Sequence, residues 1–231
     1  MSLVVAFSGG KDSTAMALRY AELGTPFQML HTATGNELPA VRQHIERVRD
    51  ACGVKLVDLN APTLAELIEE QGCLPNWRMR WCTRMIKIEP CIEWLHANPD
   101  VVLAVGLRAD EEGRAGGIYE GTEVVYPLRE WGWNEADVRG YCLKRGFVPP
   151  KRTDCAVCFF QTVYEWYELW RDHPEMWTQG EEWERVTGFT FRGPNRDTWP
   201  AGMKNLAQAF AGGGIPKQRR HRNQMCRICA T

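Results

Sequence analysis

The amino end of this chain passes from a short apolar run into a pair of glycines and then into a helical pattern, and this order constrains the fold more than any other feature. Leu3–Phe7 is β-branched and apolar, as buried parallel strands are. The hexapeptide Ser8–Ser13 (SGGKDS) follows at once and opens a helical pattern that reaches Leu23, where Gly24 is placed to end it. The chain is therefore expected to begin with a parallel strand, a glycine turn and a helix.

Apolar runs and helical patterns continue to alternate as far as residue 145. Such alternation is typical of an α/β fold, in which a parallel sheet carries helices on both faces. The expected strands after the first are residues 27–32, 55–59, 101–106 and 123–128. The expected helices after the first are residues 39–51, 64–70, 85–97 and 135–145.

The composition changes after Pro149-Pro150, and this predicts a domain boundary. A chain of 231 residues is long enough for one large domain, or for one domain with a small appendage. We expect an α/β domain over residues 1–150 and a small helical cap with a basic tail over residues 151–231. Two stretches of the cap, 162–171 and 175–186, have helical patterns rich in Trp and Tyr.

Charge and apolar content exclude several classes of protein. Lys and Arg number 28 against 29 Asp and Glu, so a globally basic nucleic-acid binder is not expected. No run of about 18 apolar residues is present, which predicts no membrane span. The amino end lacks the basic stretch and cleavage site of a signal peptide. We therefore expect a cytoplasmic protein whose nine cysteines are reduced.

The Ser8–Ser13 hexapeptide has the composition of an anion-binding loop. Its two glycines let the backbone approach a ligand, and successive N–H groups at a helix N-terminus bind phosphate. Lys11 adds a positive charge, and Ser8 and Ser13 add hydroxyl donors, so the loop suits a pyrophosphate. The spacing is not that of a Walker A loop. A plain Gly-Gly turn is the alternative interpretation.

Further short motifs follow this loop along the chain. They are Thr34–Pro39 (TGNELP), Trp81–Arg84 with Lys87 and Pro90, Gly106–Arg108 with Arg114, Tyr126–Leu128 with Trp131, and Cys155 and Cys158 before an aromatic-rich helix. Together with the loop they resemble the phosphoadenosine phosphosulfate (PAPS) reductase-like family of the PP-loop ATP pyrophosphatase, or adenine-nucleotide α-hydrolase, superfamily. The resemblance covers residues 1 to about 185 and implies a Rossmann-like (HUP-type) α/β fold.

The resemblance implies an enzyme that binds ATP with Mg2+ and cleaves the bond between its α- and β-phosphates. A substrate oxygen would attack the α-phosphorus, and pyrophosphate would leave into the glycine loop. The adenylated substrate would then be displaced by a sulfur or nitrogen nucleophile. The implied catalytic residues are Lys11, Asp12, Arg108 and Arg114. The implied nucleotide-binding residues are Ser8, Gly9, Gly10, Lys11, Asp12, Ser13, Thr34, Gly35, Glu37 and Gly106.

Three of these residues have a structural alternative. The guanidinium groups of Arg108 and Arg114 suit phosphate binding, since they can donate two parallel hydrogen bonds. Their alternative role is in surface salt bridges, for which the neighbouring acidic residues are Asp110, Glu111 and Glu112. Glu37 would equally be a carboxylate near a helix N-terminus.

The chain departs from the family in two places. Ala33 stands where the family usually has the Asp of its DTG motif, and the ECGxH tail with the nucleophilic cysteine of true PAPS reductases is absent. The intact loop favours ATP cleavage and adenylation. One alternative is a thioredoxin-dependent PAPS or APS (sulfonucleotide) reductase. The other is a non-catalytic accessory protein that binds a nucleotide or a nucleic acid.

Two CxxC pairs predict a metal site. CxxC spacing lets two thiolates bind one metal, and four thiolates complete a site for Zn2+ or a [4Fe-4S] cluster. Alternatively, one pair is a redox dithiol or consists of reduced thiols without a metal. Four other cysteines have core-like contexts, namely Cys52, Cys73, Cys91 and Cys142. The candidate ligands are Cys82, Cys155, Cys158, Cys226 and Cys229.

Two further features bear on partners. The aromatic residues over 164–183 would form either a base-stacking platform or the core of the cap. The basic residues of the tail would bind the phosphates of tRNA or DNA or of a small nucleotide, or form a solvated tail. They are Lys217, Arg219, Arg220 and Arg222. The candidate partners are thus an adenine nucleotide, a thioredoxin-like reductant or sulfur donor, tRNA or DNA, and a second copy of the chain in a homodimer.

Overall fold

The computed structural model describes residues 1–111, 113–114, 121–194 and 196–218, and divides the chain into two compact units. The sheet unit consists of Met1–Ala33, Glu37–Ala61 and Lys87–Thr153. The helical unit consists of Thr34–Asn36, Pro62–Ile86 and the described residues after Thr153. Within the described ranges, none of the helices is both long and apolar enough to cross a membrane. The domain boundary near residue 150 stays a prediction.

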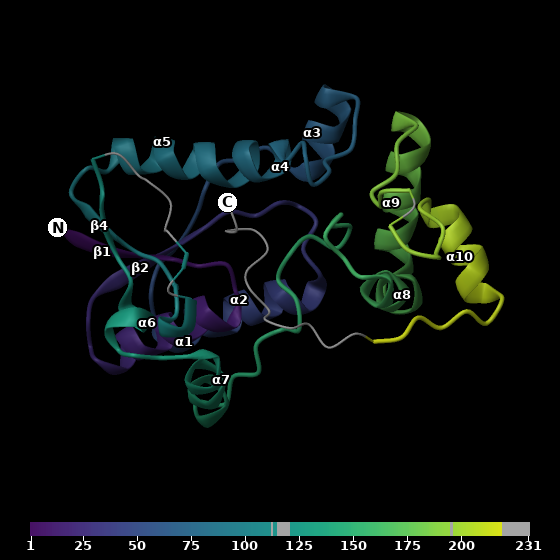
Figure 1. Ribbon diagram of the computed structural model, residues 1–231. Helices are drawn as coiled ribbons and strands as arrows, with labels where there is room; N and C mark the ends of the chain where they lie inside the picture. Colours follow the sequence, from purple (N-terminus) through teal and green to yellow (C-terminus); the bar gives the residue numbers. More distant parts are fainter. Residues whose placement is uncertain (112, 115–120, 195, 219–231) are drawn as a thin grey trace. The chain divides into compact units, whose positions relative to one another are not determined.

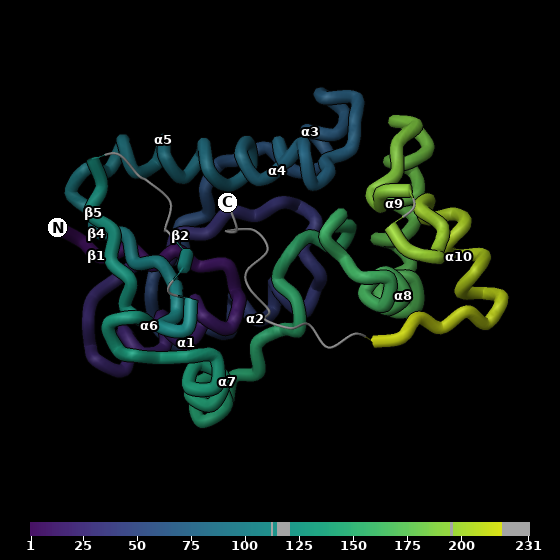
Figure 2. Tube along the Cα trace, in the orientation of Figure 1, coloured from purple at the N-terminus to yellow at the C-terminus, as the bar shows by residue number. Residues whose placement is uncertain are grey.

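Within the described residues, the sheet unit is built on five parallel strands in the order β3-β2-β1-β4-β5. The central strand is β1, whose Val5 pairs with Met29 on one side and Ala104 on the other. After β3, at one edge of the sheet, the chain returns past the centre to β4 on the other side of β1; Figure 2 traces the chain and labels β1, β2, β4 and β5. Open α/β sheets bind ligands where the strand order reverses in this way. The strands are β1 (Ser2–Ala6), β2 (Phe27–His31), β3 (Leu56–Asp58), β4 (Val101–Ala104) and β5 (Glu123–Val125).

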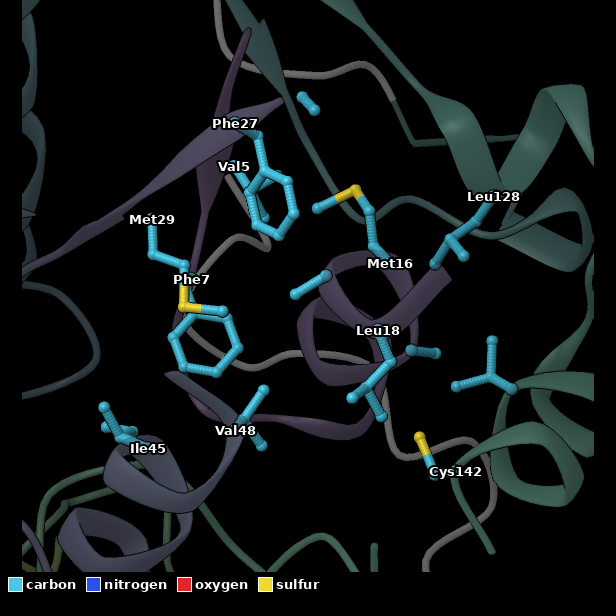
Figure 3. Packing of buried hydrophobic residues seen from close by; sticks show 14 of the residues in the cluster. Val5, Phe7, Met16, Leu18, Phe27, Met29, Ile45, Val48, Leu128 and Cys142 are labelled. Atoms are coloured by element: carbon cyan, nitrogen blue, oxygen red, sulfur yellow. The ribbon is translucent and has the colours of Figure 1, made fainter. Parts of the chain in front are cut away.

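One face of the sheet carries the larger core. Figure 3 shows Met16 and Leu18 of α1 in this core, together with Met29, Val48 and Cys142 from other elements. Residues 13–18 of α1 are buried without interruption, because the helix contacts both the sheet and its neighbouring helices. Each buried aliphatic side chain contributes about 1.5–3 kcal/mol. The helices on this face are α1 (Lys11–Glu22), α2 (Pro39–Cys52), α6 (Pro127–Glu130) and α7 (Glu135–Lys144).

The opposite face is covered by α5 (Glu89–Ala97), as Figure 1 shows. Leu95 of this helix packs with Val4, Leu30 and Leu103. These three strand residues are sequence neighbours of Val5, Met29 and Ala104, and successive side chains of a strand point to opposite faces. The sheet is therefore buried on both sides, which explains why its strands are apolar runs without polar alternation.

Two stretches differ most from their expected extents. Instead of one helix over 85–97, a short α4 (Trp81–Thr83) and a π-helical turn (Arg84–Ile88) precede α5. Pro90, in the first turn of α5, explains the widened turn, because a proline ring clashes with the carbonyl four residues earlier in a regular α-helix. The strand expected over 123–128 stops at Val125, since Pro127 begins α6.

The helical unit has an aromatic core. Trp166 is fully buried, and its ring centroid lies 6.2 Å from those of Trp177 and Phe191. The ring of Phe210 contacts Trp177 and Tyr167. The aromatic residues therefore form the core of this unit, which is one of the two roles expected for them. Besides α4, the helices are α3 (Leu64–Gln71), α8 (Val163–Asp172), α9 (Pro174–Thr187) and α10 (Met203–Ala211).

Helix α10 is absent from the sequence-based expectations. The region after Gly188 is rich in glycine and proline, and this composition hides a short helix. The signal that marks it is the spacing of its buried residues Met203, Leu206 and Phe210, at i, i+3 and i+7.

Candidate functional site

The loop between β1 and α1 is closed by its own side chains. The Ser13 hydroxyl accepts a hydrogen bond from the Ser8 N–H at 3.3 Å and donates one to the Gly10 carbonyl at 3.2 Å. Gly9 has a φ of +72°, and a Cβ there would lie 2.8 Å from Cγ1 of Ile45 on α2. Position 9 therefore requires glycine for two reasons, the backbone conformation and the packing.

Gly10 is the N-cap of α1, and no side chain caps this end of the helix. The N–H groups of the first turn have no partner within a helix, and the positive end of the helix dipole lies with them. Anions bind at such helix ends. An anion here would meet backbone N–H donors and, in the same turn, the charge of Lys11.

Lys11 and Asp12 are the first two residues of α1 and form an ion pair. Lys11 Nζ lies 3.2 Å from Oδ2 of Asp12. Burial raises the pKa of the Asp12 carboxyl, and the charges of Lys11 and Arg108 offset this effect only in part. A buried carboxylate is unfavourable unless cations compensate it. Both cations therefore favour the ionised form of Asp12.

Arg108 links the end of β4 to the first turn of α1. Its side chain is 3% exposed, Nη1 lies 3.2 Å from both carboxylate oxygens of Asp12, and Nε lies 2.8 Å from Oδ1 of Asp110. Burial by itself lowers the pKa of the guanidinium, but the hydrogen bond to Asp110 and the charges of Asp12 and Glu111 raise it above its ordinary value. Arg108 is shared among three carboxylates, so it neutralises Asp12 only partly. Salt bridges to Asp110 and Glu111, the alternative role expected for Arg108, are therefore observed.

A second arginine, Arg129 in α6, holds the loop after β4 that carries Arg114. Nη2 of Arg129 donates to the carbonyl oxygens of Glu111 and Arg114, at 2.7 Å each. Nη1 of Arg114 lies 2.7 Å from Oε1 of Glu111, which is the ion-paired role expected as its alternative, while Glu112 lies outside the described residues. Arg129 was not predicted from the sequence. Arginine is usually exposed, and no local pattern indicates that its side chain donates to carbonyl groups 15 and 18 positions away.

Gly106 lets the chain that leaves β4 pass close to α1. A Cβ at this position would lie 3.4 Å from the backbone carbon and from the Cβ of Asp12, at the short limit of ordinary contact. This close approach brings Arg108 within reach of Asp12. The sheet unit thus gathers the Ser8–Ser13 loop, Gly106, Arg108 and Arg114 at the carboxyl ends of the adjacent strands β1 and β4.

The other predicted nucleotide-binding residues follow β2 and divide between the two units. Thr34 and Gly35 belong to the helical unit. Gly35 has a φ of +73°, and a Cβ there would lie 2.9 Å from Cγ2 of Thr63. Glu37 belongs to the sheet unit, is buried, and has its Oε2 atom 3.8 Å from Nη2 of Arg42 in α2. Glu37 directly precedes the N-cap of α2, so a position near a helix N-terminus, its expected alternative, is observed.

Cys155–Cys158, here named the cysteine turn, is closed by hydrogen bonds rather than by a disulfide. Its two middle residues are buried, and both cysteines are partly exposed. Asn36 and Gln161 satisfy the polar backbone groups of the turn. Neither of these two residues was identified from the sequence as contributing to the turn.

No metal centre is assembled within the described residues. In that part of the chain, no three His, Cys, Asp or Glu side chains lie close enough together to hold a metal ion. The expectation that Cys82 joins Cys155 and Cys158 as ligands therefore gains no support. The predicted metal and tail residues that lie outside the described ranges are Cys226, Cys229, Arg219, Arg220 and Arg222.

The four cysteines expected in core contexts are buried to different degrees. Cys142 is fully buried, and burial raises the pKa of its thiol to about 12. Cys52 and Cys91 are partly buried, and burial raises the pKa of each thiol to about 11. Cys73 is also partly buried. Thiols with a raised pKa stay protonated at neutral pH, which suits residues that fill space.

More than half of this chain is similar to a domain of known type. Residues 2–147 match the phosphoadenosine phosphosulfate reductase domain. This chain belongs to the PAPS reductase family. The match confirms the resemblance that the motifs indicate, and it includes the Ser8–Ser13 loop and Gly106–Arg108 but ends before the cysteine turn.

Two curated proteins share part of this sequence. Sulfate adenylyltransferase subunit 2 of Streptomyces lavendulae is 30% identical over 142 residues, which are 57% of this chain and 40% of that protein. An uncharacterized protein of Methanocaldococcus jannaschii is 26% identical over 133 residues, which are 54% of this chain and 32% of that protein. The chain thus covers less than half the length of either relative.

Among solved structures, a PAPS reductase from Candida auris in a phosphate complex has the same fold. The TM-score is 0.54 at 15% sequence identity, over 64% of this chain and 75% of that one. At this identity the likeness concerns the fold alone. It confirms the Rossmann-like α/β architecture expected from the alternating strands and helices.

Proposed function

We propose that this member of the PAPS reductase family binds ATP, or an adenylyl nucleotide, at the Ser8–Ser13 loop and cleaves the bond between the α- and β-phosphates to adenylate a substrate. The observation that carries the proposal is the loop itself, which combines a required glycine at position 9, a helix N-terminus without a side-chain cap, and Lys11. Such a site suits pyrophosphate, the leaving group of this reaction. The name of the Streptomyces lavendulae relative, a sulfate adenylyltransferase subunit, supports adenylyl transfer.

In this reaction the chain's own residues bind and orient. The N–H groups of the first turn of α1 and the Lys11 ammonium group neutralise the leaving pyrophosphate. Asp12 holds Lys11, at 3.2 Å, and Arg108 holds Asp12 from the adjacent strand end. A substrate oxygen attacks the α-phosphorus and displaces pyrophosphate. A sulfur or nitrogen nucleophile of a second substrate then attacks the adenylated substrate and displaces AMP.

Mg2+ fits this loop as a companion of ATP. It takes oxygen ligands, largely from phosphates and water, with one or two protein carboxylates. Asp12 is a carboxylate of the loop, but Lys11 and Arg108 already engage it, so phosphate oxygens of ATP would be the main ligands. When bound, Mg2+ supplies neutralising charge to the phosphates.

A zinc ion or [4Fe-4S] cluster does not fit the described residues alone. Either group needs four ligands, and this part of the chain does not bring three candidate ligands together. No step of the proposed reaction therefore uses such a group. The predicted ligand set, with Cys226 and Cys229, is tested by iron and zinc analysis of anaerobically purified protein.

The decisive experiment follows the products from labelled nucleotides. With ATP, Mg2+, candidate acceptors and a sulfur or nitrogen donor, the proposal expects release of AMP and pyrophosphate. If instead only PAPS or APS is consumed and sulfite forms in the presence of a dithiol reductant, the protein is a sulfonucleotide reductase. If no nucleotide is consumed but one binds, it is a non-catalytic accessory protein.

Calorimetry on Lys11→Ala tests the loop directly. Removing one charged donor to a phosphate should weaken ATP-Mg2+ binding by about 10- to 100-fold. The matched control is Lys144→Ala, since Lys144 is exposed at the end of α7 in the same unit. Equal affinities of the two variants would show that the loop is only a turn.

A further inference from the structure

Asn36 joins two segments of the helical unit that are far apart in the sequence. Its side chain is almost fully buried. The Asn36 carbonyl oxygen accepts a hydrogen bond from the Ala156 N–H at 2.7 Å, and its Oδ1 accepts one from the Val157 N–H at 3.1 Å. Its Nδ2 donates to Oε1 of Gln179 on α9 at 3.3 Å. One residue thus holds both middle peptides of the cysteine turn.

The two middle residues of the cysteine turn are buried, and its two cysteines are partly exposed. Ala156 and Val157 are 0% and 1% exposed. A Cβ at Gly180 of α9 would lie 2.8 Å from Cγ1 of Val157, so this helix approaches the turn closely. Gln161 closes the other side, because its Nε2 donates to the Ala156 carbonyl. The middle of the turn is therefore held by Asn36, by Gln161 and by its packing against α9.

The same contacts reach the predicted nucleotide-binding residues. The Cys155 thiol donates to the Thr34 hydroxyl, with Sγ and Oγ1 3.3 Å apart. The Thr34 hydroxyl also accepts a hydrogen bond from the Asn36 N–H at 3.3 Å. A ligand that engages the Thr34 hydroxyl therefore acts on a group already bonded to the cysteine turn.

We propose that Asn36 is a positioning residue that couples the Thr34–Asn36 segment to the cysteine turn. A nucleotide bound at Thr34 and Gly35 then slows the opening of the hydrogen bonds that hold the turn. The nucleotide arm of this proposal rests on the proposed function. The positioning arm rests only on the hydrogen bonds of Asn36. Asparagine suits the position because its amide accepts from Val157 and donates to Gln179 at once.

The positioning arm is tested by amide hydrogen exchange in Asn36→Ala, read residue by residue by NMR. Val157 loses its acceptor, so its exchange should quicken about three- to tenfold, while Ala156 keeps its backbone acceptor and should change little. Asn36→Asp keeps the acceptor and should leave Val157 slow. The matched control is Asn76→Ala, because the Asn76 side chain accepts from two N–H groups of another turn in the same unit.

Two results would overturn the positioning role. One is an unchanged Val157 rate in Asn36→Ala. The other is an equal acceleration of amides across the whole unit, which would mean general loss of stability. If Asn36→Ala does not fold, Asn36→Asp decides, since rapid exchange at Val157 while the other amides of the unit stay protected would contradict the assigned acceptor.

The nucleotide arm uses ATP-Mg2+ at concentrations that calorimetry shows to be saturating. ATP should slow exchange at Val157 in the natural protein at least twofold and have no such effect in Asn36→Ala. If ATP binds but Val157 does not respond, the coupling is wrong and the proposed function stands. If ATP does not bind, the proposed function and the coupling both fail, and the exchange data without nucleotide still decide the positioning role.

Discussion

The glycine loop at residues 8–13 and the cysteine turn are both short backbone segments with a predicted chemical role, but they are held in different ways. The loop is closed by Ser8 and Ser13, five positions apart, and by the helix that follows it. The turn is closed by Asn36, which lies 121 positions before Val157 in the sequence. When local contacts hold a motif, the sequence reveals both the motif and its geometry. When distant residues hold it, the sequence reveals only its reactive side chains.

The strongest challenge to this contrast is Arg108, a distant residue that also contacts the loop. Arg108→Leu removes the cation shared by Asp12, Asp110 and Glu111 and should lower the free energy of unfolding by about 3–5 kcal/mol. Urea unfolding measures the loss. Adding Asp12→Asn to this variant should recover part of it, because one buried carboxylate is then neutral. A loss below about 1 kcal/mol would show that the loop needs no distant support.

The local part of the contrast is tested by comparing two glycines with left-handed backbone. Gly24→Ala should cost about 1–2 kcal/mol, since φ is +66° but nothing lies within 4 Å of the new Cβ. Gly9→Ala should cost about 1–3 kcal/mol more, because the new Cβ also overlaps Ile45. Chemical denaturation of both variants gives the difference. Equal losses would mean that packing against α2 does not shape the loop.

A buried histidine behind the loop adds a dependence on pH. Nε2 of His44 lies 2.9 Å from Oγ1 of Thr14 in the first turns of α1, and burial, helped by Arg47, lowers the pKa of His44 to about 4. As the pH falls from 6.5 toward 4, the unfolded chain binds this proton and the folded chain does not. Stability is therefore lost in that window, by up to about 3 kcal/mol.

The measurement is urea unfolding between pH 7 and pH 4. In His44→Gln the loss over this window should be smaller than in the natural protein, whereas His96→Gln, at an exposed residue of α5, should leave it unchanged. An identical slope in the natural protein and His44→Gln would place the acid sensitivity elsewhere.

The smallest expected effect concerns the turn. Gln161 is fully buried, and Gln161→Ala would leave the Ala156 carbonyl without this donor, at a cost of about 1–2 kcal/mol. Thermal unfolding can detect a change of this size. Gln208→Ala is the control, since Gln208 is exposed on α10 of the same unit. A loss no larger than that of the control would leave Asn36 as the main support of the turn.

The fold was predictable from sequence where local pattern and burial agree. The strand, loop and helix over residues 2–22 follow their expected order, because apolar runs form buried parallel strands and glycine supplies the left-handed backbone of the turn. Prediction failed where local signals compete. Pro127 ends the expected strand early, and the glycine-rich surroundings conceal α10.

By itself, then, the sequence determined the α/β architecture, the family and the glycine loop, because each depends on residues close together in the chain. Only the tertiary structure showed that Arg108 lies against Asp12, 96 positions away, that Arg129 binds the carbonyl oxygens of the Arg114 loop, and that Asn36 holds the cysteine turn. These contacts form when strand ends and helices from distant segments pack together. No local pattern of residues specifies them, since a buried polar side chain is satisfied by whichever group the fold brings within hydrogen-bonding distance.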